Sequence, residues 1–123
     1  MKILIAEDNP DNMDMLTRRL QRRGFVTHGV GDGRQALDVL EAFRPDVILM
    51  DVSMPVMSGL EATRIIRKES KGHSHTPIIM LSAHAMESDR ARCFEAGCDA
   101  FATKPIDFKA LLRLIVQTKK GAA

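Results

Sequence analysis

The chain has 123 residues, of which 45% are hydrophobic and 28% are charged, and its formal net charge is only +2. This length is typical of one domain, so residues 1–123 are expected to fold as one unit that needs no disulfide or structural metal. The charge is too small to indicate a nucleic-acid binder, and no apolar run is long enough to span a membrane. Cys93 and Cys98 match no zinc or redox spacing, which favours a reduced, cytoplasmic setting.

In the first half of the chain, short apolar runs alternate with amphipathic segments. The sequence predicts strands at residues 3–6, 25–30 and 46–51, because each run is apolar and bounded by turn residues. A helix is predicted from Pro10, with Asn9 as its cap, to just before Gly24. A second helix is predicted to begin at Asp32-Gly33 and to stop before Pro45.

The second half repeats the alternation. A third helix is predicted through Ile65 and Ile66, then a strand at 77–81, a helix from Glu87 to Ala96 that ends at Gly97, and a short strand at 99–103. A last helix is predicted through residues 108–115. Five strands alternating with five helices indicate an α/β fold with a parallel sheet covered on both faces. Right-handed crossovers leave few topologies, and the flavodoxin-like strand order 2-1-3-4-5 is favoured.

Polar residues collect where these predicted strands end. Glu7-Asp8 follows the first strand, Asp51 ends the third, Ser82-Ala83 follows the fourth, and Thr103-Lys104-Pro105 ends the fifth. The carboxyl ends of parallel strands share one edge of a sheet, so three carboxylates, a hydroxyl and an ammonium are expected there together. Two carboxylates roughly 5 Å apart repel by about 3 kcal/mol at an intermediate dielectric, so such a cluster recruits protons or a cation. Oxygen ligands with room for water suit Mg²⁺.

These motifs resemble those of the receiver domains of bacterial two-component response regulators, and the resemblance covers essentially the whole chain. Each motif is weak alone, but their order and their positions on the strand ends are specific. The motifs are Glu7-Asp8, Asp51 with Met54-Pro55 and Gly59 behind it, Ser82-Ala83, and Lys104-Pro105.

The resemblance implies that Asp51 is the phosphorylated residue, converted to 4-aspartylphosphate by a histidine kinase or a histidine phosphotransfer protein. It implies Mg²⁺ held by Asp8, Asp51 and the backbone carbonyl of Ser53, with Glu7 acting largely through water. Lys104 is expected to bond one phosphoryl oxygen.

Signal output is also implied by the resemblance. Ser82 is expected to bond another phosphoryl oxygen, and Phe101 occupies the position of a switch residue, although a plain core phenylalanine is the alternative. The Lys104-Pro105 bond is expected to be cis. His84 and Ser53 are expected to flank the path of the water that hydrolyses the acyl phosphate.

The implied function is a cytoplasmic signalling switch that catalyses only its own Mg²⁺-dependent phosphorylation and dephosphorylation. It would contact a downstream protein as a monomer or weak dimer, and would bind no nucleic acid or membrane directly. Arg18, Arg19, Arg22 and Arg23 form a basic cluster that reads as a solvated face or as a docking site for an acidic partner.

Three alternatives stay open. An aspartyl-phosphate phosphatase would need an acid two residues after Asp51, where the chain has Ser53. An FMN carrier would need a phosphate-binding loop where the chain has the acidic Glu7-Asp8. The chain is also compatible with a receiver domain taken from a hybrid kinase. His73 and His75 lie two apart but lack a third metal ligand nearby in the sequence.

Overall fold

The computed structural model describes residues 1–69, 72–73, 75–83 and 86–122, and its strands and helices alternate along the whole chain. The strands are β1 (Lys2–Ala6), β2 (Val26–Val30), β3 (Val47–Asp51), β4 (Ile78–Ser82) and β5 (Ala100–Thr103). The helices are α1 (Pro10–Arg22), α2 (Gly33–Phe43), α3 (Gly59–Glu69), α4 (Glu87–Ala96) and α5 (Phe108–Ala122).

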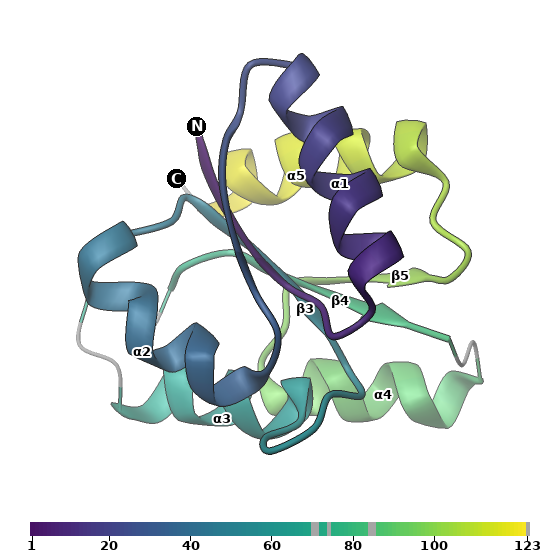
Figure 1. The fold of residues 1–123 in the computed structure, drawn as a ribbon. Coiled ribbons are helices and arrows are strands. Elements are labelled where there is room, and N and C mark those ends of the chain that lie inside the picture. Colours follow the sequence, from purple (N-terminus) through teal and green to yellow (C-terminus); the bar gives the residue numbers. More distant parts are fainter. Residues whose placement is uncertain (70–71, 74, 84–85, 123) are drawn as a thin grey trace.

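The strands form one parallel sheet in the order β2-β1-β3-β4-β5 (Figure 1), which confirms the predicted fold class and strand order. Helices α1 and α5 cover one face of the sheet, and α2, α3 and α4 cover the other. Alternate residues of the buried strands point to the two faces, so Leu49 packs on the first side and Met50 on the second. The central strands β3 and β4 are therefore apolar up to their last residue, as a doubly covered parallel sheet requires.

The local signals in the sequence account for most helix ends. The Asn9 side chain accepts a hydrogen bond from the backbone N–H of Asn12 at 3.0 Å, and Pro10 is the first residue of α1. Asp32 caps α2 in the same way. Gly97 ends α4 with a φ of 113°, a conformation that L side chains rarely adopt.

Strand boundaries differ from the prediction by a residue or so. Strand β1 begins at Lys2, and β4 begins after Pro77 and includes Ser82. Proline has no N–H for the sheet, which explains why β4 starts one residue later than the apolar run. In the part of the chain that the structure describes, no helix is long and apolar enough to cross a membrane.

The residues with weaker predicted roles are placed as follows. Cys93 and Cys98 are buried free thiols. His73 is buried, with its Nδ1 3.4 Å from the hydroxyl of Thr76, and His75 is exposed. His84 lies outside the described residues.

Candidate functional site

An acidic cluster forms where β1 and β3 end. Glu7 and Asp8 follow β1, and Asp51 is the last residue of β3. One carboxylate oxygen from each of these three residues lies within 4.8 Å of the others, and among the described residues this is the group suited to hold a metal ion. Glu7 and Asp51 are buried, whereas Asp8 is exposed at the mouth of the cluster. The strand ends thus bring together the three carboxylates that the sequence predicted would meet.

Lys104 supplies a positive charge to the same site. Its Nζ lies 3.0 Å from Glu7 Oε1 and 3.2 Å from Asp51 Oδ2. The backbone N–H of Lys104 donates to the carbonyl oxygen of Ser82 at 2.7 Å, which fixes the start of this segment against β4. The Lys104-Pro105 peptide bond is cis, as the resemblance implied. One ammonium therefore contacts two of the three carboxylates and offsets only part of the charge of the cluster.

This arrangement disfavours a charged Asp51. Burial, together with the neighbouring Glu7, raises the pKa of Asp51 from 3.8 to about 7, although Lys104 acts in the opposite direction. Burial lowers the pKa of Lys104, but its contacts with Glu7 and Asp51 outweigh this and raise that pKa overall. At neutral pH, a cation near Asp51 would therefore favour the ionised form of its carboxyl group.

Two neighbours, Asn12 and Gly59, shape the surroundings of the carboxylates. The Asn12 side chain, in the first turn of α1, donates to Glu7 Oε1 at 2.9 Å. Gly59, at the start of α3, lies so close to β3 that a Cβ there would sit 2.0 Å from the backbone oxygen of Asp51. Gly59 was expected from its motif behind Asp51, whereas the role of Asn12 was missed. The position of Asn12, one turn after its helix cap Asn9, could have indicated that its side chain faces the site.

The remaining predicted site residues lie beside the cluster. The backbone N–H of Ser53 donates to Asp51 Oδ1 at 3.4 Å. Ser82 is buried at the end of β4. Phe101 pairs in register with Met80, and Ser82 with Thr103, so Ser82 and Phe101 lie on the same face of the sheet. That shared face is the geometric condition for the proposed coupling between them.

These features describe an α/β domain with a parallel sheet and an acidic site, contacted by one lysine, beyond the carboxyl ends of its strands. Residues 3–116 match the family profile described as the response regulator receiver domain. The chain therefore belongs to the receiver domain family of two-component systems, as its sequence motifs indicated. Members of this family are signalling domains.

Known proteins of two architectures resemble the chain. It is 43% identical over 120 residues to hybrid signal transduction histidine kinase I of Dictyostelium discoideum, covering 93% of this chain but only 7% of the kinase. It is 35% identical to the polar-differentiation response regulator DivK of Brucella anthropi, covering 92% of this chain and 91% of DivK.

A solved structure extends the similarity to the site. The receiver domain of sensor histidine kinase PA1611 from Pseudomonas aeruginosa superposes with a TM-score of 0.89 at 37% identity, covering 97% of each chain. That structure has a magnesium ion coordinated in its active-site cleft. The acidic cluster of Glu7, Asp8 and Asp51 has the ligand types for the same ion.

Proposed function

We propose that Asp51 accepts a phosphoryl group from the phosphohistidine of a histidine kinase or histidine phosphotransfer protein. The observation that carries this proposal is the geometry around Asp51: a buried carboxylate at a strand end, with Glu7, Asp8 and Lys104 gathered at it. A structural aspartate has no need of two further carboxylates, because each adds repulsion. The phosphorylated chain would then signal by contact with a downstream protein.

The proposed transfer forms a P–O bond to Asp51 and breaks the P–N bond of the donor phosphohistidine. An oxygen of Asp51 attacks the phosphorus atom, and the P–N bond to the donor histidine breaks with its electron pair going to the imidazole nitrogen. The product is an acyl phosphate on Asp51. Lys104 lies 3.2 Å from Asp51 Oδ2, so its ammonium is placed to bond a phosphoryl oxygen after transfer. Ser82 is the proposed donor to another oxygen.

The residues present fit a divalent cation. Three carboxylates within 4.8 Å of one another form an oxygen-rich group that one lysine does not neutralise. We assign Asp8, Asp51 and the backbone carbonyl of Ser53 as direct ligands, with Glu7, already bonded to Lys104, acting largely through water. A bound Mg²⁺ would supply positive charge that favours ionised Asp51 and neutralises charge on the transferring phosphoryl group.

We propose that the signal passes through Ser82 and Phe101. Ser82 would be drawn toward the phosphoryl group, and Phe101, on the same face of the sheet, would take the space this leaves. The change shifts an existing equilibrium between two arrangements of the α4–β5–α5 surface. The chain would act in the cytoplasm as a monomer or weak dimer, without binding nucleic acid or membrane, and would catalyse no reaction beyond its own phosphorylation and dephosphorylation.

Labelling with acetyl phosphate and Mg²⁺ tests the site. The wild-type chain should acquire one acid-stable, base-labile phosphoryl group, seen by intact mass, and Asp51→Asn should acquire none. Asp11→Asn is the matched control, because Asp11 is an exposed aspartate of α1 outside the cluster. Equal labelling of Asp51→Asn and the wild type would refute the assignment. Hydrolysis of small phosphate esters in many turnovers would favour the phosphatase alternative.

A further inference from the structure

Helix α4 is held to the molecule mainly by its second half. Its buried residues are Cys93 and Ala96, whereas Glu87, Ser88 and Arg90 in the first turns are exposed. The residue that caps its N-terminus, Met86, is 69% exposed and makes no side-chain capping bond. Apolar burial, the main source of helix attachment, is therefore concentrated at the C-terminal end.

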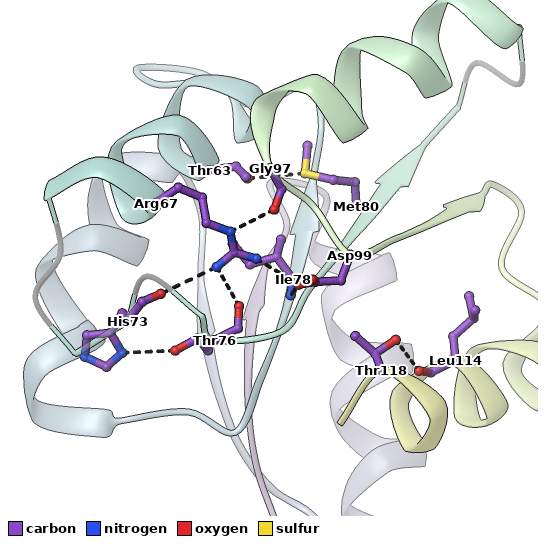
Figure 2. Close-up of polar contacts among 10 residues, drawn as sticks. All are labelled: Thr63, Arg67, His73, Thr76, Ile78, Met80, Gly97, Asp99, Leu114 and Thr118. Atoms are coloured by element: carbon purple, nitrogen blue, oxygen red, sulfur yellow. Dashed lines mark hydrogen bonds and ion pairs between the residues drawn. The ribbon is translucent and has the colours of Figure 1, made fainter. Parts of the chain in front are cut away.

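A partly buried arginine fixes that C-terminal end (Figure 2). The Nε of Arg67, in α3, donates to the carbonyl oxygen of Gly97 at 2.8 Å. Its two other nitrogens donate to the carbonyl oxygen of Thr76 at 2.7 Å and to Asp99 Oδ2 at 2.8 Å. Asp99 Oδ2 also accepts from the backbone N–H of Ile78 at 2.9 Å. One guanidinium thus ties the end of α4 to the starts of β4 and β5.

The first half of α4 is joined to β5 by a different arginine. The Arg90 guanidinium lies 5.9 Å from the ring centre of Phe101 and 5.3 Å from that of Phe94, one turn along the same helix. Arg90 and Phe101 also line a hollow of about 330 Å³, together with residues of β5, of the loop after it and of α5. The Phe94 contact orders the guanidinium within α4, and the Phe101 contact links α4 to the sheet.

We infer that Arg90 is a latch that holds Phe101 and the first half of α4 in the unphosphorylated arrangement, while Arg67 is the fixed pivot at the other end. The inference rests on the proposed function, since it takes phosphorylation of Asp51 as the event that moves Phe101. Movement of Phe101 removes the cation–ring contact and frees the exposed half of α4. The buried half stays in place because the Arg67 bonds do not involve Phe101.

The strengths of the two attachments fit these roles. One exposed cation–ring contact shifts a two-state equilibrium by about two- to fivefold, which is small enough for a phosphoryl group to overcome. The Arg67 side chain is only 17% exposed and makes several bonds at once, so the C-terminal end of α4 stays attached to the sheet. Arg90 is a positioning residue in this scheme, because it acts on Phe101 and touches no reacting atom.

Fluorine NMR tests the latch directly. The chain has five phenylalanines and no tryptophan or tyrosine, so incorporation of fluorophenylalanine gives few signals to assign. In the unphosphorylated protein, Arg90→Ala should move the Phe101 signal toward its position in wild type with beryllofluoride and Mg²⁺, and Arg90→Lys should move it less. Arg19→Ala is the matched control, because Arg19 lies 5.5 Å from the ring centre of Phe108 on the other side of the sheet. It should move the Phe108 signal and leave that of Phe101 unchanged.

Amide hydrogen exchange separates the latch from the pivot. In Arg90→Ala, exchange at the amides of residues 89–91, in the first half of α4, should quicken about two- to fivefold, while amides near Cys93 and Ala96 stay as in wild type. Arg67→Lys, which keeps the aliphatic stem should the alanine variant not fold, should instead quicken exchange near the C-terminal end. The two variants must therefore give opposite patterns along one helix.

Three results would overturn the inference. They are an unmoved Phe101 signal in Arg90→Ala, the same exchange pattern for both arginine variants, and no response of the wild-type Phe101 signal to beryllofluoride with Mg²⁺. The first two are measured without phosphorylation, so they fail independently of the proposed function. The labelling of Asp51 decides the proposed function on its own, whatever the latch does.

Discussion

Replacing Asp51 by asparagine should stabilise the metal-free protein, and the gain should grow with pH. The side chains have nearly the same shape, but asparagine cannot ionise. Asp51 has a pKa of about 7 in the folded chain, mainly because it is buried and faces Glu7. In the unfolded chain its pKa returns to about 3.9. Folding therefore favours the protonated form of Asp51, and ionisation works against the fold.

The size of the effect follows from this difference in pKa. A carboxyl group whose pKa is higher in the folded state does not destabilise the fold at pH values below its unfolded-state pKa. As the pH rises from the unfolded-state pKa to the folded-state pKa, the group progressively lowers the free energy of unfolding. A shift of about three units sets a ceiling of about 4 kcal/mol. Solvent and counterions reach the cluster through its exposed side at Asp8, so we expect about half of that ceiling, roughly 2 kcal/mol at about pH 8.

Urea unfolding followed by far-ultraviolet circular dichroism measures the change, since the chain has no tryptophan or tyrosine to report by fluorescence. Asp51→Asn and wild type should unfold with nearly equal free energies at about pH 4 and diverge through neutral pH. Asp38→Asn is the control: Asp38 is exposed and paired only at the surface with Arg34, so its effect should stay within about 0.5 kcal/mol.

Mg²⁺ should make the wild type more stable than Asp51→Asn. A cation at the cluster stabilises the wild type, whereas the variant offers it one carboxylate fewer. A stability difference that does not change between about pH 4 and about pH 8 would refute the assigned charge repulsion. A variant less stable than wild type at the higher pH would refute it as well, and would indicate that Lys104 overcompensates the carboxylates.

Three further outcomes are expected. Asp8→Ala should weaken Mg²⁺ binding about tenfold or more, measured by calorimetry, and leave the fold intact or slightly more stable, since it removes one repelling charge; unchanged affinity would remove Asp8 from the ligand set. Gly59→Ala should lower the free energy of unfolding by about 1–3 kcal/mol or more, because its Cβ would meet the backbone of Asp51 at 2.0 Å, and an unchanged unfolding midpoint in urea would contradict the close approach. Ser82→Ala should still be phosphorylated on Asp51, but binding of its phosphorylated form to a downstream partner should fall toward that of the unphosphorylated chain; wild-type binding would show that the signal takes another route.

Much of the fold could be predicted because each local signal has a direct physical cause. The apolar runs of β3 and β4 can be buried only between two helical layers, and the capping residues Asn9 and Asp32 satisfy backbone N–H groups at the helix starts. Boundaries were less certain where two effects compete. Pro77 is apolar but cannot donate to the sheet, so β4 begins one residue beyond it.

The candidate site, like the fold, could be predicted only in part from the sequence. The meeting of Glu7, Asp8, Asp51 and Lys104 followed from strand ends in a parallel sheet, and the structure brings these residues together. The sharing of Lys104 between two carboxylates could not be predicted, because it depends on where a long flexible side chain settles. The contact of Arg90 with Phe101 was missed for the same reason: the two residues are eleven apart, and no periodicity relates a helix surface to the next strand.

The shared lysine offers a route by which the proposed charge change at Asp51 would affect residues beyond the site. Lys104 Nζ bonds both Glu7 and Asp51, while its backbone N–H is held by Ser82 at the end of β4. The proposed phosphoryl group on Asp51 would add negative charge and new acceptor oxygens beside that ammonium, and would change the balance between its two partners. The same backbone bond joins the ends of β4 and β5, and β5 carries Phe101 against Arg90 of α4. Under the proposed function, a change in the partners of Lys104 would therefore reach the α4–β5–α5 surface through this backbone bond.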